Sequence, residues 1–190
     1  MSENIEDILK SAELSIKDSV SSTELTLLGN ERAAFNSDKL LVVNKVPVQN
    51  RIKSNRVVFH YGLLDKEIGA IGNEKENIIG MCELKVFDEL NTDKLSQQLT
   101  KVLGKAKFDT IINSNEAEVV DNAIVPTDKK IQTQVAIWMS KGNVYYYNST
   151  LLEKTKSQDG ANLYIFKQKD KEWKGFLKSS GYNFVDKIDE

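Results

Sequence analysis

The chain has little of the chemistry that disulfides and metal sites need: among its 190 residues there is one cysteine and one histidine. A single cysteine excludes an internal disulfide framework, and one cysteine with one histidine cannot complete a zinc site of nitrogen and sulfur ligands. Gly69 and Gly72 are not followed by the Lys-Ser/Thr pair of a phosphate-binding loop, so we interpret them as turn residues. We therefore expect no metal and no cofactor.

Long apolar runs are also lacking, which argues against a hydrophobic membrane span. The formal net charge of −2 gives the whole molecule no strong attraction to nucleic acid or to an anionic membrane. Residues 1–7 are acidic and polar, unlike a secretory signal peptide. We predict a soluble cytoplasmic protein without membrane contact, and a mature secreted chain whose leader has been removed stays open as the alternative.

The length predicts one domain over residues 1–190. Glycines cluster around residues 63–77, so this is where we place the boundary if there are two units. Residues 181–190 follow the last predicted helix, and we expect them to form a loosely held tail.

The most informative stretch is residues 132–148, which predicts a β-hairpin. Two β-rich runs flank either Gly142-Asn143 or Lys141-Gly142, and both pairs suit a tight turn. Because side chains alternate along a strand, either turn gives the same two faces. One face carries Ala136, Trp138, Tyr145 and Tyr147, and the other carries Ile137, Met139, Val144 and Tyr146. Both faces are apolar, so the hairpin lies in the centre of a sheet or one face meets a partner.

Apolar periodicity and turn residues divide the remaining chain into alternating helices and strands. The patterns predict helices over residues 1–10, 93–103 and 170–180, and strands over 39–49, 56–64, 78–87, 108–113, 117–125 and 163–166 in addition to the hairpin. Runs of strands broken by single helices indicate an α+β fold. We expect a mostly antiparallel β-sheet of about eight strands covered by two or three short helices.

Two residues are candidates for nucleophilic or acid–base chemistry. Cys82 shares a strand face with Leu84 and Val86, which predicts a buried and unreactive thiol. His60 lies in mid-strand with no neighbour in sequence to orient it, so we interpret it as a partly exposed or hydrogen-bonded structural histidine. The scarcity of catalytic residue types favours a protein that is not an enzyme.

Three function hypotheses remain open, and the leading one is a non-catalytic protein-interaction or assembly protein. It would act through a sheet surface and an amphipathic N-terminal helix, with a protein partner or a second copy. Its candidate residues are Trp138, Tyr145, Tyr147, Ile5, Ile8 and Leu9. The N-terminal helix covering its own sheet is an equal alternative to docking. Trp138 likewise meets either a helix of its own chain or a second molecule.

The second hypothesis is binding of single-stranded nucleic acid by residues 39–61, which contain five lysines and arginines and no acid and end in three ring-bearing residues. Its candidate residues are Arg51, Lys53, Arg56, Phe59, His60 and Tyr61. The third hypothesis is an enzyme that uses carboxylates, because paired carboxylates are assembled in space and leave no spacing signature.

Overall fold

The computed structural model describes residues 3–20, 24–25, 31–43, 46–47, 55–61, 64–65, 70–71, 77–87, 89–120, 123–152 and 157–189. These residues form an α+β fold around one eight-stranded sheet, with strand order β1-β2-β5-β8-β12-β11-β10-β9. Every strand pair in this sheet is antiparallel. The predicted fold class is therefore confirmed. Most of the segment 63–77, where we placed a domain boundary, lies outside the described residues.

The sheet consists of β1 (Glu24–Leu25), β2 (Glu31–Phe35), β5 (Arg56–Tyr61), β8 (Ile79–Val86), β9 (Phe108–Val120), β10 (Ala123–Ser140), β11 (Asn143–Leu152) and β12 (Ser157–Lys167). Two small ribbons pair β3 (Val42–Val43) with β4 (Val46–Pro47) and β6 (Leu64–Asp65) with β7 (Ala70–Ile71). The helices are α1 (Ile5–Ser11), α2 (Glu89–Leu103) and α3 (Lys171–Ser179), with 3-10 helices η1 (Ile16–Asp18) and η2 (Asn183–Ile188). In the described part of the chain, no helix has the length and apolar character to cross a membrane.

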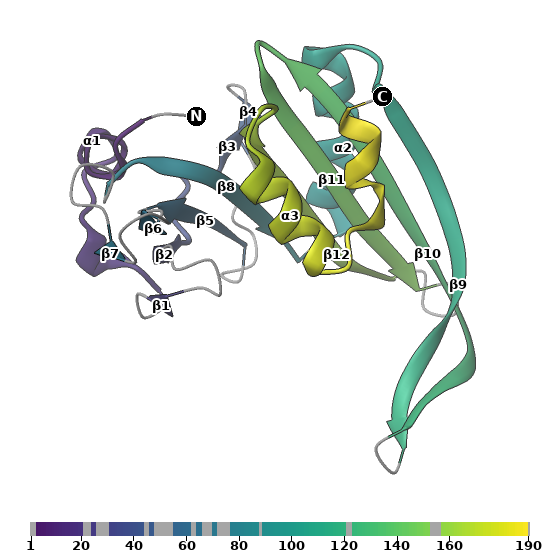
Figure 1. The fold of residues 1–190 in the computed structure, drawn as a ribbon. Helices are drawn as coiled ribbons and strands as arrows, with labels where there is room; N and C mark the ends of the chain where they lie inside the picture. Colours follow the sequence, from purple (N-terminus) through teal and green to yellow (C-terminus); the bar gives the residue numbers. More distant parts are fainter. Residues whose placement is uncertain are drawn as a thin grey trace.

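Helices cover both faces of the sheet (Figure 1). Helix α1 packs on β2, β5 and β8, and α2 packs on β8, β10, β11 and β12. Leu84 of the α2 cluster pairs with Val57 of the α1 cluster, which places these two helices on the same face. Helix α3 and η2 pack together on the opposite face. The result is a sheet that is apolar on both sides of its central strands.

The predicted hairpin is the centre of this core. Its turn uses the Lys141-Gly142 alternative, with positive φ angles of 51° and 75° at the two residues. Trp138 pairs with Tyr145, and Ile137 pairs with Tyr146. The two predicted faces are confirmed, because the Trp138 face contributes to the α2 cluster and the Ile137 face to the α3 cluster.

Strands β9 and β10 differ from the sequence prediction. The short strands predicted over 108–113 and 117–125 are wrong: residues 108–120 are one continuous strand, and β10 begins already at Ala123. The polar residues 113–115 indicate a turn by composition, yet here they pair with residues 130–132 of β10. Cross-strand pairing therefore overrides local propensity, and the two strands form a long hairpin.

The C-terminal segment also differs from its prediction as a loosely held tail. Residues 183–188 form η2, and its Val185 and Ile188 are buried in the α3 cluster. Burial of these two side chains holds the segment on the sheet, together with a hydrogen bond from Lys107 Nζ to the carbonyl of Ile188 at 3.0 Å. Ion pairs of Lys174 with Asp189 and of Lys178 with Asp186 add to these contacts, so packing against the rest of the chain orders the segment.

Helix α3 approaches the sheet closely because β8 has a glycine beneath it. A register shift in the β5–β8 pairing leaves Gly80 out of the ladder. A Cβ atom built at Gly80 would lie 2.5 Å from the indole nitrogen of Trp173, which is fully buried. Glycine is thus the residue that lets the indole of Trp173 lie against the strand.

This contact predicts that Gly80→Ala lowers the free energy of unfolding by about 1–3 kcal/mol, because a packed core resists an added methyl group. Gly175→Ala, in α3 itself, is the matched control, since no atom lies within 4 Å of the added Cβ. It should raise the free energy of unfolding by about 0.5–1 kcal/mol through helix propensity. Denaturant titration of both variants measures the difference. Equal stabilities of wild type and Gly80→Ala would contradict the close packing of Trp173.

Candidate functional site

The predicted interaction residues of the hairpin are covered by the chain's own helix. Trp138 is 2% exposed, and its indole N–H donates to the carbonyl of Gly104 at 3.1 Å, just beyond the end of α2. Tyr147 donates its hydroxyl to the carbonyl of Thr92, near the start of α2, at 3.3 Å. Tyr145 is buried in the same cluster. This face of the hairpin is therefore covered by α2 of the same chain and not by a second molecule. Trp138, Tyr145 and Tyr147 are not exposed at the surface.

The N-terminal helix likewise packs on its own sheet. Ile5 and Leu9 are buried against β2, β5 and β8, and Ile8 is partly buried at the same cluster. The side chain of Asn4 caps the helix by accepting a hydrogen bond from the backbone of Glu6 at 2.8 Å. The alternative in which this helix caps its own sheet is therefore the correct one, and the apolar face of α1 is already occupied.

The basic and aromatic stretch does not form the predicted stacking surface. Phe59, His60 and Tyr61 are all buried in the core, so their rings are not accessible to nucleic-acid bases. The guanidinium of Arg56 lies 5.6 Å from the ring centre of Phe87. Arg51 and Lys53 lie outside the described residues.

His60 belongs instead to a buried polar cluster that the sequence did not reveal. Its Nε2 lies 3.6 Å from a carboxylate oxygen of Glu83, on the neighbouring strand β8. The other oxygen of Glu83 lies 3.2 Å from the ammonium of Lys85. Burial opposes ionisation of Glu83, but the hydrogen bond with His60, the charge of Lys85 and the hydroxyl of Tyr164 together hold its pKa below the ordinary value. Glu83, on the neighbouring strand, therefore orients His60, which has no such group close to it in sequence.

The cluster continues to the C-terminal segment through two tyrosines. The hydroxyls of Tyr164 and Tyr182 lie 2.7 Å apart. Burial raises the pKa of both, so both stay protonated. The edges of Trp173 and Phe176 close over the ring of His60, with ring centres 5.5 and 5.9 Å from it. Helix α3 covers the cluster. These contacts hold α3 and the C-terminal segment on the sheet.

Cys82 lies on the predicted strand face but is only partly buried. It lines a cavity of about 550 Å³ between α1 and the sheet, whose rim carries the Lys39–Glu13 ion pair. Burial raises the pKa of the Cys82 thiol to about 12, so the thiolate that reacts with electrophiles is scarce at neutral pH. Within the described residues, no group of three or more His, Cys, Asp or Glu side chains could hold a metal ion.

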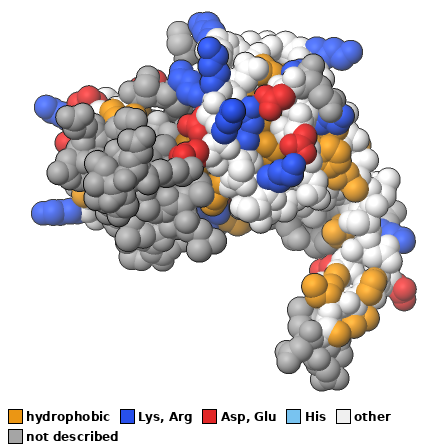
Figure 2. All heavy atoms as spheres, viewed as in Figure 1, with side chains coloured by type: hydrophobic (Ala, Val, Ile, Leu, Met, Phe, Trp, Pro, Cys, Tyr) orange, Lys and Arg blue, Asp and Glu red, His pale blue; other side chains and the backbone are white. Residues whose placement is uncertain are grey.

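The strongest candidate surface is the far part of the β9–β10 hairpin. Pairing of β10 with β11 ends at Ile131, and from there outward β10 pairs with β9 only. We call this two-stranded part, residues 115–120 and 123–130, the arm; it projects away from the body (Figure 1). Ile124 is 79% exposed and Val125 is 40% exposed. Figure 2 shows hydrophobic side chains along the arm, which extends beyond the helices in the ribbon view (Figure 1).

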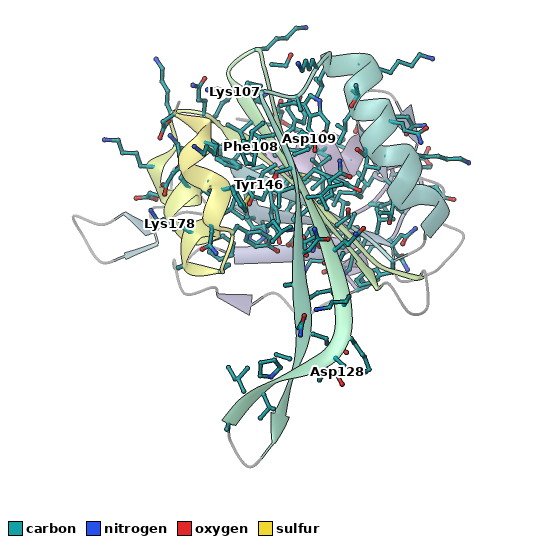
Figure 3. All side chains as sticks on the ribbon, turned by 90° about the vertical axis from the view of Figure 1, so that its right-hand side faces the viewer. Lys107, Phe108, Asp109, Asp128, Tyr146 and Lys178 are labelled. Carbon is teal, nitrogen blue, oxygen red and sulfur yellow. The ribbon has the colours of Figure 1, made fainter. Side chains whose placement is uncertain are left out.

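A second surface lies on the outer side of α3. Here Lys169, Lys171, Lys174, Gly175 and Lys178 line a cavity of about 590 Å³ together with Asp186 of η2. We call it the α3 groove. Lysines and acids alternate over this region in Figure 2. Figure 3 shows Lys178 on the outer side of α3 and Asp128 on the arm, well apart in the same molecule.

The buried cluster generates a prediction for pH-dependent stability. Because the pKa of Glu83 is lowered in the folded state, its ionisation stabilises the fold at pH values above the ordinary carboxyl pKa of about 4.3, and this contribution is lost as the pH falls through the folded-state pKa. Glu83→Gln should lower the free energy of unfolding at pH 7 by about 3–5 kcal/mol, because it leaves buried partners without their charge. The acid side of the stability–pH curve should also become flatter.

Glu13→Gln is the matched control for Glu83→Gln. Glu13 forms an ion pair with Lys39 at the surface, where water screens the charges, so the same substitution should change stability little. Chemical denaturation at a series of pH values measures both variants. A Glu83→Gln protein as stable as the control would show that the cluster does not anchor α3.

Comparison of the chain with protein-family models, with curated proteins and with solved structures finds no match. Function must therefore be inferred from the arrangement of this chain's own residues.

Proposed function

We propose that the chain is a non-catalytic assembly protein whose copies associate through the arm. The observation that carries the proposal is the exposure of Ile124, at 79%, and of Val125, at 40%, on a ribbon to which the described residues add no third strand. A two-stranded ribbon in water is marginally stable by itself, and exposed apolar side chains on it add no cohesion. Contact with another molecule would bury them and stabilise the ribbon.

The apolar faces of the central hairpin and of the helices support this choice, because they are covered. The Trp138 face lies under α2, the face of Ile5 and Leu9 lies on the sheet, and Trp173 lies under α3. Each of these large apolar side chains already has its cover within the chain. The arm is the described element that combines projection from the body with strongly exposed branched aliphatic residues.

A second copy is the partner that the charges favour. In sequence, residues 115–130 carry the four acids Glu116, Glu118, Asp121 and Asp128 and the two lysines Lys129 and Lys130. Of these, Glu116 is already paired with Lys129 at 2.9 Å. The same chain carries the lysine-lined α3 groove on another surface. Opposite charges on two surfaces of one chain guide association between copies, because complementary potentials raise the encounter rate and disfavour like-charged approaches.

Ile124→Thr combined with Val125→Thr tests the proposal. Threonine keeps the β-branched shape and the strand propensity while it replaces a methyl or ethyl group by a hydroxyl. Wild type should show a solution mass that rises with concentration, and the variant should associate at least ~10-fold more weakly because apolar burial is lost. Light scattering coupled to size-exclusion chromatography measures both.

Ile16→Thr combined with Val102→Thr provides the control, since both residues are exposed but lie outside the arm. This control should associate like wild type. A wild-type chain that stays monomeric over the whole concentration series would overturn the proposal, and so would equal association of the arm variant and the control.

A further inference from the structure

The two edges of the eight-stranded sheet differ in length. One edge is β1, with two residues, and the other is β9, which runs from Phe108 to Val120. Among the described elements, none pairs with the outer side of β9. Figure 3 shows this edge from outside, with β9 in the middle of the view and α3 and α2 on either side of it. A long unpaired edge strand is a template for a strand of another molecule, because every second residue turns its backbone N–H and C=O groups outward.

The part of β9 that precedes the arm, residues 108–114, lacks the features that protect edge strands from pairing. We call it the β9 edge. Natural edges are protected by lysine, proline, bulges or shortness. The β9 edge contains no lysine, arginine or proline, and its pairing with β10 has no register shift. Its only charged residue is Asp109, and Ile111 at its midpoint is 60% exposed. The β9 edge is therefore open to a second strand.

The backbone groups of Ile111 are among those that face outward. Ser140 and Asn143 flank the two-residue turn, and residues in these positions direct their backbone groups at each other. Even-numbered residues of β10 therefore direct these groups at β11, and odd-numbered residues direct them at β9. The odd-numbered residues of β10 pair with even-numbered residues of the β9 edge, as Val135 does with Thr110. The odd-numbered residues of the β9 edge are thus the ones whose N–H and C=O groups point away from the sheet.

The side chains of the β9 edge match those of its own copy when a two-fold axis passes through Ile111. In this antiparallel register Ile111 meets Ile111 of the second copy, and Asp109 meets Asn113. Gln134 donates to one carboxylate oxygen of Asp109 at 3.1 Å, which leaves the second oxygen to accept from an amide. Asn113 has no hydrogen-bond partner among the described residues, so its amide can be that donor. On this face the register buries the exposed isoleucine and opposes no like charges.

The other face of the β9 edge also suits this register. Phe108 and Ile112 lie on the side of α3, where both are partly buried in the α3 cluster. In the two-fold register Phe108 meets Ser114 of the second copy, and Thr110 meets Ile112. All four residues are uncharged, so pairing on this face does not place an unpaired charge between the two copies.

Resting on the proposed function, we propose that two copies associate by antiparallel pairing of their β9 edges about a two-fold axis at Ile111. Main-chain hydrogen bonds then join the two sheets into one continuous sheet. The arm begins at residue 115, directly after the β9 edge, so each arm extends past the start of β9 in the other copy. The contact uses the same surface on both copies, which closes the assembly as a dimer.

Ile111→Lys tests the centre of the contact. Two ammonium groups would face each other at the two-fold axis, so self-association should weaken by on the order of 10-fold or more. Val20→Lys is the matched control, because Val20 is 54% exposed, lies far from β9 in the sheet order and gains the same charge. It should associate like wild type. Light scattering coupled to size-exclusion chromatography measures association, and thermal unfolding checks that both variants are folded.

An exchange of two side chains tests the pairing of Asp109 with Asn113. Asn113→Asp alone sets two carboxylates opposite each other on both sides of the axis, so association should weaken. Adding Asp109→Asn restores one carboxylate opposite one amide, and association should return to within about threefold of wild type. This recovery does not depend on any gain in folding stability. A double variant that associates as weakly as Asn113→Asp alone would contradict the register.

Cross-linking through an introduced cysteine locates the axis. Residues that form a hydrogen-bonded antiparallel pair have Cα atoms about 5.5 Å apart, which a disulfide can span. Ile111→Cys should therefore give a covalent dimer under mild oxidation. Ser114→Cys is the control, because in this register the two cysteines would be about 20 Å apart at ~3.4 Å per residue. Electrophoresis without reductant compares the two variants, and equal cross-linking of both would overturn the register.

The failures of the two proposals are distinguishable when Ile111→Lys is compared with the arm variant that carries Ile124→Thr and Val125→Thr. If Ile111→Lys associates like wild type while the arm variant does not, pairing of the β9 edges is overturned and the proposed function stands. If only Ile111→Lys loses association, the copies associate without the apolar contact of the arm, so the edge pairing stands and the role proposed for the arm is wrong. If neither variant differs from wild type, both proposals are wrong.

Discussion

The constraint on which the structure depends is the burial of both faces of β10. Val135, Ala136, Ile137 and Trp138 are four consecutive buried residues, so alternate side chains need an apolar cover on opposite sides of the sheet. Helix α2 supplies one cover, and α3 with η2 supplies the other. Antiparallel sheets often leave one face to water, but this pattern forbids it. The chain therefore uses α2, α3 and η2 to cover both faces of this strand.

The sequence predicts this part of the fold well because its signals are local. Alternation in the hairpin assigns each side chain to a face, and apolar periodicity predicts helices over 93–103 and 170–180, where α2 (Glu89–Leu103) and α3 (Lys171–Ser179) lie. Which molecule covers each face is a different question. Trp138 meets α2 of its own chain through contacts across more than thirty residues, as the hydrogen bond to Gly104 with a separation of 34 shows. Periodicity contains no information on such contacts.

The candidate sites were less predictable, for two separate reasons. The contact of His60 with Glu83 depends on strand order, since β5 and β8 become neighbours only once the sheet is assembled. The arm depends on pairing of residues 115–120 with 123–130, although residues 113–115 favour a turn by composition. In the first case distant residues meet, and in the second a weak local preference is overridden. The acidic composition of the arm is visible in the sequence, but its projection from the body is not.

The free energy of burying Ile124 and Val125 limits the kind of assembly that the arm can support. Complete burial of Ile124 and Val125 contributes roughly 1.5–3 kcal/mol for each side chain, whereas association costs about 4–15 kcal/mol in lost translational and rotational freedom. These two residues alone do not hold two copies together, so the contact requires further burial and charge pairing along the ribbon. An interface of this composition is expected to be weak for a single contact and sensitive to salt.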